Sequence, residues 1–161
     1  MTTMQKRINE AIHLTKQAEY LEALTLFLDI YGSEEAPPVQ DAKAASGLSY
    51  FGLSLALVQK KYRLAVDLCR RALDLEFYNG DHYANLAHVY MISGQRKKAY
   101  ETVQTGLRLL PDHEGLQRAR RQLGVRSRPA VPFLDRSHPI NVTLGQARQQ
   151  KKVVVAEKRK K

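Results

Sequence analysis

The chain has 161 residues, of which 43% are hydrophobic and 26% charged, as is typical of a soluble globular domain. This composition excludes a fully disordered or collagen-like chain, and the single cysteine, Cys69, excludes a disulfide-built mini-protein. The net charge is +10. No apolar run reaches the roughly 18 residues of a membrane span, and the charged start Met1–Arg7 predicts no secretory signal and a cytoplasmic location.

Residues 4–38 predict a first pair of helices. The first helix, at about 5–17, keeps Ala11 and Leu14 at helical spacing. The second helix carries its apolar stripe at Tyr20, Ala23, Phe27, Ile30 and Tyr31. Prolines follow it, and proline interrupts a regular helix.

Residues 41–79 predict a second pair. The loop at 32–41 and an early helix start account for its extra length. The apolar stripes are Leu48, Phe51, Gly52 and Leu55 in one helix, and Tyr62, Ala65, Cys69, Ala72 and Leu73 in the other. Asn79–Gly80 ends the second helix, and we expect Cys69 to be a core residue, since buried cysteine behaves as a small hydrophobe.

Residues 80–113 predict a third pair, followed by a short capping helix at 113–123 that ends at Gly124. The apolar and small residues at helical spacing in this pair, with the glycine of its turn and the proline that ends it, are Tyr83, Leu86, Ala87, Tyr90, Gly94, Ala99, Val103, Gly106, Leu107 and Pro111. A capping helix is expected because the last pair of a repeat stack would otherwise expose its apolar side.

The pattern of the third pair resembles the tetratricopeptide repeat (TPR), whose 34-residue period also separates Ala65 from Ala99. The resemblance covers about 5–124. It implies an all-α solenoid of helix-turn-helix repeats, a right-handed superhelix whose concave face is lined by the first helix of each pair. In such proteins the concave face commonly receives a partner peptide. Carried onto this chain, the implied groove residues are Ile8, Ile12, Lys16, Ser49, Leu53, Leu57, Ala84, His88 and Ile92.

These groove residues are mostly apolar. They lack the ring of Lys, Arg and Asn with which some repeat domains of this family clamp the acidic C-terminus of a chaperone. The resemblance therefore favours an apolar or amphipathic partner segment.

Residues 125–161 predict an extended, basic tail. Residues 112–161 carry 13 basic and 4 acidic side chains, a net charge of +9, against +1 for residues 1–111. Six large apolar residues lie among three prolines: Val131, Phe133, Leu134, Ile140, Val142 and Leu144. Such a segment suits either a strap that packs on the repeats or a linear motif that another protein captures.

The end of the tail is a candidate for contact with an anion. Its cations are Lys151, Lys152, Lys158, Arg159, Lys160 and Lys161. Nucleic-acid phosphates, a lipid surface and a simply solvated end are all compatible with this charge. No aromatic residue lies among these cations to stack on bases.

Catalytic and metal-binding patterns are not evident in the sequence. The five histidines have no zinc-like spacing, and no glycine loop suits a phosphate. Asp135, Ser137 and His138 have the residue types of a hydrolase triad, but triads are assembled through the fold and not within four residues. We therefore expect no enzyme, no cofactor and no metal.

The sequence predicts a non-enzymatic scaffold that holds a protein partner in its groove. One alternative is a nucleic-acid- or ribosome-associated protein that uses the basic tail. A second alternative is a secretion-type chaperone.

Overall fold

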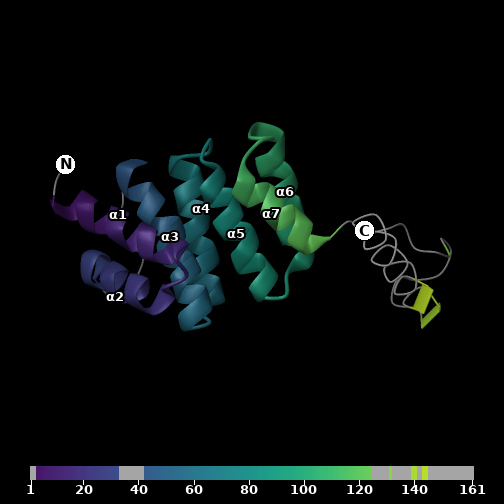
Figure 1. Ribbon diagram of the computed structural model, residues 1–161, viewed down its shortest axis with the longest axis horizontal. Coiled ribbons are helices and arrows are strands. Elements are labelled where there is room, and N and C mark those ends of the chain that lie inside the picture. The colour runs from purple at the N-terminus through teal and green to yellow at the C-terminus, as the bar shows by residue number, and fades with distance from the viewer. Residues whose placement is uncertain (1–2, 33–41, 125–130, 132–138, 141–142, 145–161) are drawn as a thin grey trace, which may run out of the picture. The chain divides into compact units, whose positions relative to one another are not determined.

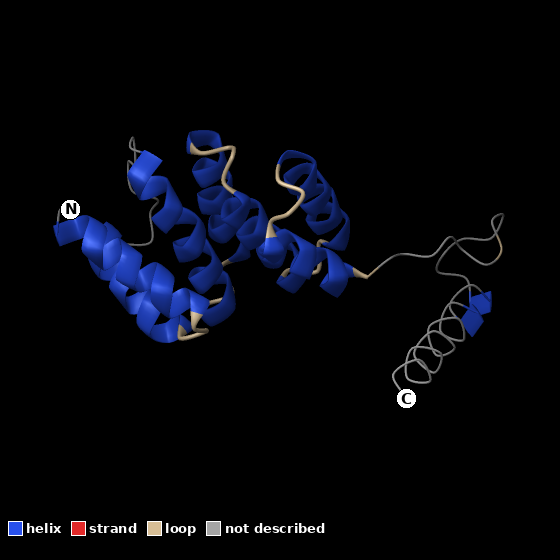
Figure 2. Cartoon of the chain, turned by 45° about the horizontal axis from the view of Figure 1, so that its top comes forward, coloured by secondary structure: helices blue, strands red, loops and turns tan. Residues whose placement is uncertain are grey.

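The computed structural model describes residues 3–32 and 42–124, and in the tail residues 131, 139–140 and 143–144; for 42–45 it describes the backbone alone. The chain divides into two units, Met1–Gly124 and Val125–Lys161. All regular structure in the described ranges is helical (Figure 2). The expectation of an all-α fold is confirmed.

Within residues 3–32 and 42–124, the first unit contains seven helices that follow one another in chain order (Figure 1). They are α1 (Thr3–Lys16), α2 (Tyr20–Tyr31), α3 (Ala42–Val58), α4 (Tyr62–Leu75), α5 (Gly80–Ile92), α6 (Arg96–Leu109) and α7 (Glu114–Leu123). The predicted three helix pairs and the capping helix are all present. As expected, α3 starts early and has 17 residues.

The helices stack as consecutive pairs. The first helices of the pairs form one layer, in which α1 packs on α3, α3 on α5 and α5 on α7. Each second helix packs against the helix before it and the helix after it, so that α2 lies against both α1 and α3, and α4 against both α3 and α5. This arrangement is a helix-turn-helix repeat stack, in which each pair completes its core with its neighbour.

The turns inside the three pairs share one backbone feature. Ala18, Lys60 and Gly94 occupy the corresponding position in the three turns, and all have positive φ angles, of 67°, 58° and 77°. Glycine adopts this left-handed conformation without a steric penalty, whereas other residues adopt it at a cost. The sequence signals the conformation only at Gly94, because only that turn carries a glycine.

The small residues of the repeat pattern lie at helix crossings. Ala11, Ala87, Ala23, Ala65 and Ala99 are all fully buried. One core cluster joins α1–α4 around Phe27 and Phe51, and a second joins α3–α7 around Tyr90 and Val103. The second cluster includes Leu123 of α7, so the capping helix covers the last pair as expected.

The start and end of α7 are fixed by side-chain and backbone hydrogen bonds. The Nδ1 atom of His113 accepts a hydrogen bond from the backbone N–H of Leu116 at 3.3 Å and caps the helix. At the other end, Arg96 donates to the carbonyl oxygen of Leu123 at 2.8 Å, and Gly124 follows with a φ of 71°. These contacts tie α7 to the third pair.

Cys69 lies in the core, as its place in the repeat predicts. Its side chain is fully buried between α3 and α4, where Sγ lies 3.5 Å from the carbonyl oxygen of Ser49. Burial raises the pKa of the thiol far above its usual range. The reactive thiolate is therefore suppressed.

We expect a thiol reagent to modify Cys69 slowly in the folded protein and rapidly in denaturant. Absorbance of released thionitrobenzoate after addition of Ellman's reagent measures both rates. Equal rates in the two conditions would show that Cys69 is accessible and would contradict this packing.

In the second unit, the structure describes residues 131, 139–140 and 143–144. The backbone is helical at 139–140 and 143–144. The hydroxyl of Thr143 donates to the carbonyl oxygen of Pro139 at 3.0 Å. Proline is tolerated in the first turn of a helix, where its missing N–H would have no partner.

Candidate functional site

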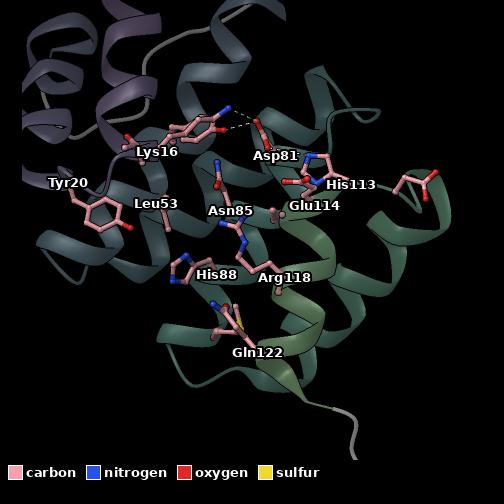
Figure 3. Close-up of a pocket in the computed structure, with 17 residues that line it drawn as sticks. Lys16, Tyr20, Leu53, Asp81, Asn85, His88, His113, Glu114, Arg118 and Gln122 are labelled. Atoms are coloured by element: carbon pink, nitrogen blue, oxygen red, sulfur yellow. Dashed lines mark hydrogen bonds and ion pairs between the residues drawn. The ribbon is translucent and has the colours of Figure 1, made fainter. Parts of the chain in front are cut away.

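A cleft of about 800 Å³ opens on the layer formed by α1, α3, α5 and α7 (Figure 3). Each of these four helices contributes side chains to its wall, and Tyr20 at the start of α2 completes one edge. The first helices of the repeats therefore line a common concavity, as the resemblance implied.

The cleft has a buried floor and an exposed rim. The floor consists of residues that are at most 8% exposed: Thr15, Tyr50, Leu53, Asn85 and Ala119. The rim consists of exposed polar residues: Lys16, Asp112, Glu114, Arg118 and Gln122. Between them lie the half-buried Ala84, His88, Met91 and His113.

Asp81, in the first turn of α5, connects the walls at one end of the cleft. Its Oδ2 accepts hydrogen bonds from the Tyr50 hydroxyl at 2.6 Å and from Lys16 Nζ at 3.3 Å. Its Oδ1 lies 3.2 Å from Nε2 of His113. One carboxylate thus joins residues of α1, α3 and α5 to the N-cap of α7.

These contacts also determine the charge state of this end of the cleft. Burial alone would raise the pKa of Asp81, but the hydrogen bond from Tyr50 and the charges of Lys16 and His113 outweigh it, and the pKa is lowered. Burial and the same hydrogen bond raise the pKa of Tyr50. The Lys16 ammonium also lies 5.5 Å from the centre of the Tyr50 ring, within the range of a cation–π contact. At neutral pH the group therefore contains an ionised Asp81 that is already hydrogen-bonded.

A second polar group lies beneath the floor, between α3 and α5. The Ser49 hydroxyl lies 2.8 Å from Nδ1 of His82, and Nε2 of His82 lies 3.2 Å from Oε2 of Glu76. Asn85 donates to the same Ser49 oxygen at 3.1 Å. Ser, His and Glu in this order resemble a hydrolase triad, but Ser49 and His82 are both 0% exposed. No substrate can reach the serine, so the group is structural.

Burial lowers the pKa of His82, although Glu76 and Asp81 act in the opposite direction. The folded state thus favours the neutral imidazole, with Nε2–H donating to Glu76 and Nδ1 accepting from Ser49. Below about pH 6.5, the usual value for histidine, the unfolded chain takes up the proton before the folded protein does. Stability is therefore lost as the pH falls through this range.

We expect the free energy of unfolding by urea to fall between pH 7.5 and pH 5.5, in part because of His82. The variant His82→Gln should lose that share of the pH dependence. His13, which is exposed on α1, offers the matched control His13→Gln, which should retain it. An unchanged pH dependence in His82→Gln would contradict this assignment.

The structure brings together only part of the predicted groove set. Lys16, Leu53, Ala84 and His88 line the cleft. Ile12, Leu57 and Ile92 are half-buried, pack against the core clusters and are not among its lining residues.

Two of the predicted groove residues are interior residues, which corrects the expectation. Ile8 is 1% exposed and faces Gly47 of α3, and Ser49 is covered by His82 and Asn85 of the next repeat. Neither side chain is available to a partner. Beside the apolar residues expected of the groove, α7 adds the polar residues Glu114, Arg118 and Gln122.

Sequence reasoning missed Tyr50, Asp81, Asn85 and Arg118. The signal for Asn85 was its position one residue after Ala84 on a helix already assigned to the groove. No sequence signal pointed to Arg118, because the register of the capping helix relative to the groove was not assigned.

Most of the predicted tail contacts lie outside the described residues. These are Phe133, Leu134, Val142, Lys151, Lys152, Lys158, Arg159, Lys160 and Lys161. Val131 is half-buried, whereas Ile140 and Leu144 are 46% and 43% exposed.

The described residues contain no group of three or more His, Cys, Asp or Glu side chains placed to hold a metal ion. None of the helices among them is long and apolar enough to cross a membrane.

Comparison with known proteins identifies the fold. No protein-family model matches the sequence, and no curated protein matches it either. Among solved structures, the chain is similar to the C-terminal TPR-containing domain of an FK506-binding protein from Plasmodium falciparum. The identity is 19% and the TM-score 0.51, over 75% of this chain and 85% of that one. A second similar structure is MamA of AMB-1, with 19% identity and a TM-score of 0.37 over 72% of this chain and 78% of that one. The chain has the fold of a TPR domain, which confirms the resemblance seen in the sequence.

Proposed function

We propose that this TPR-fold chain is a non-enzymatic scaffold that binds a segment of a partner protein in the cleft of α1, α3, α5 and α7. The observation that carries the proposal is the cleft itself. Its volume of about 800 Å³ lies within the range of roughly 300–1,000 Å³ typical of ligand sites in proteins. Its floor is buried and its rim polar, a division that also characterises protein-binding surfaces.

The chemistry of the cleft supports binding rather than catalysis. Its acidic and basic groups at the Asp81 end are hydrogen-bonded to one another. The Ser49 hydroxyl, which has the partners of a nucleophile, is sealed beneath the floor. A partner segment would instead meet Leu53, Ala84 and Met91 flanked by polar side chains.

The proposal is tested by a pull-down from native lysate with the full-length protein and with the variant Ala84→Arg. Ala84 is half-buried on the cleft wall. Its Cβ lies 3.4 Å from the position that a Cβ would take at Gly115 of α7, so α7 leaves little room on that side. An arginine at this position must therefore project into the cleft. Circular dichroism and the Tm establish that the variant is folded.

We expect proteins captured by the wild type, and identified by mass spectrometry, to be lost with Ala84→Arg and to be indifferent to nuclease. Capture that survives Ala84→Arg and disappears with nuclease would overturn the proposal. That result would mean that the protein binds nucleic acid through the basic residues of 112–161.

A further inference from the structure

The polar groups of the cleft differ in whether they have partners. Lys16, Tyr50, Asp81 and His113 satisfy one another at one end. Arg118 lies on the opposite wall, on α7, and its side chain extends toward Asn85 and His88 of α5 (Figure 3). Within the described part of the chain, no carboxylate lies within 4.0 Å of the Arg118 guanidinium, which makes no hydrogen bond there either.

The surroundings of Arg118 favour an anionic ligand. A guanidinium presents N–H donors in a planar fork that matches a carboxylate, and it keeps its charge at any physiological pH. Beside it lie the buried Asn85 and Ala119, which reduce the water available to solvate a bound group. A partner carboxylate would form a charge-assisted hydrogen bond there.

His88 faces the same space from α5. It is half-buried and has no hydrogen-bond partner among the described residues. Burial lowers its pKa, which favours a neutral imidazole next to Arg118 rather than a second cation. A neutral imidazole retains one N–H donor, which can complete the coordination of a carboxylate.

The acidic residues of the rim restrict where a carboxylate can bind. Asp112 and Glu114 are exposed and flank His113 in the sequence, and Figure 3 shows Glu114 at the end of the cleft where Asp81 and His113 lie. They repel a carboxylate from that end. The position near Arg118 and His88 is thus the one that combines a permanent cation, a neutral donor and a desolvated floor.

We propose that the cleft recognises an acidic side chain within the partner segment, with its carboxylate seated between Arg118 on α7 and His88 on α5. The inference rests on the proposed function and specifies its ligand chemistry. Neighbouring apolar residues of the segment contact Leu53, Ala84 and Met91.

The experiment is a selection from random 12-residue peptides fused to the N-terminus of a phage coat protein, with the full-length chain as bait. The fusion removes the free C-terminal carboxylate of each peptide, so only internal acidic side chains can supply the anion. Four baits are compared: wild type, Arg118→Glu, Arg120→Glu and Ala84→Arg. Arg120 is the matched control, since it is also exposed on α7 but lies about 200° around the helix from Arg118.

We expect the wild type and Arg120→Glu to select peptides enriched in Asp or Glu, and Arg118→Glu to select peptides enriched in Lys or Arg. For one enriched peptide, fluorescence polarisation should show a roughly tenfold to hundredfold weaker Kd with Arg118→Ala, the range expected for a hydrogen bond to a charged group. Replacing its acidic residue by the amide should weaken binding to the wild type by a similar factor.

Two kinds of failure are distinguishable. The first kind is that the selected peptides lose binding with Ala84→Arg but have no preference for acidic residues, or prefer basic residues, or bind Arg118→Glu as tightly as the wild type. Any of these results overturns this inference and leaves the proposed function standing. If no peptide is enriched, or if enrichment survives Ala84→Arg, the proposed function itself fails. Should Ala84→Arg fail to fold, Gln122→Trp obstructs the same cleft from an exposed position on α7.

Discussion

Replacing Phe51 by alanine is expected to lower the free energy of unfolding by about 3–5 kcal/mol, the range for large aromatic residues in well-packed cores. Phe51 is fully buried on α3. Its ring centre lies 5.7 Å from that of Phe27 and 5.6 Å from that of Tyr31, both on α2. The substitution therefore removes apolar contacts and leaves a cavity between the first and second pairs.

Urea or guanidinium unfolding followed by circular dichroism measures this loss. Phe77→Ala is the matched control, because Phe77 is 58% exposed in the loop between α4 and α5. Its effect should stay within about 0.5 kcal/mol, as for most surface substitutions. Equal losses for the two variants would contradict the placement of Phe51 at the centre of the core.

Replacing Gly52 by valine is expected to cost about 3 kcal/mol, at the upper end of the range for overpacked cores. A Cβ at this position would lie 2.8 Å from the backbone carbonyl oxygen of Ala65 and 3.1 Å from Sγ of Cys69. The first obstacle is backbone, so α3 and α4 would have to separate. The repeat pattern requires a small residue here for this reason.

The variant Gly52→Ala tests whether a Cβ at this position raises or lowers the stability of the protein. Helix propensity alone would make alanine more stable than glycine by about 0.8–1.0 kcal/mol at a helix interior. Close packing against Ala65 predicts the opposite, a loss of stability. Chemical denaturation of both variants decides the matter, and a gain in stability for Gly52→Ala would show that the two helices are not in close contact.

The two halves of the cleft have different physical roles. At one end Asp81 binds Lys16, Tyr50 and His113, so its charge is used to join consecutive repeats. At the other end Arg118 and His88 face the cleft without partners in the described part of the chain. The first end supports the shape of the cleft, and the second offers the interactions that a ligand can complete.

The helix pairs were predictable because the signals for them are local. Apolar residues recur at the helical period, and small residues such as Ala65 and Ala99 recur at the repeat period. Both patterns follow from the geometry of one helix and its nearest neighbour. The sequence thus determined the number of pairs, their approximate bounds, the capping helix and the burial of Cys69.

The composition of the cleft depended on contacts between residues far apart in the chain. Asp81 meets Lys16, which lies 65 residues away in sequence, and Ser49 is covered by His82, 33 residues away. Periodicity places a side chain on a face of its own helix, but it does not show whether a neighbouring repeat covers that face. For this reason Ile8 and Ser49 were wrongly assigned to the groove.

The sequence by itself determined a stack of three helix pairs and a cap, because each pair is specified by its own periodic packing residues. Only the tertiary structure decided that α7 supplies a wall of the cleft and that this wall carries Arg118. The physical reason is that the register between stacked helices depends on packing across repeat interfaces. That packing determines which polar side chains are paired with one another and which face the cleft.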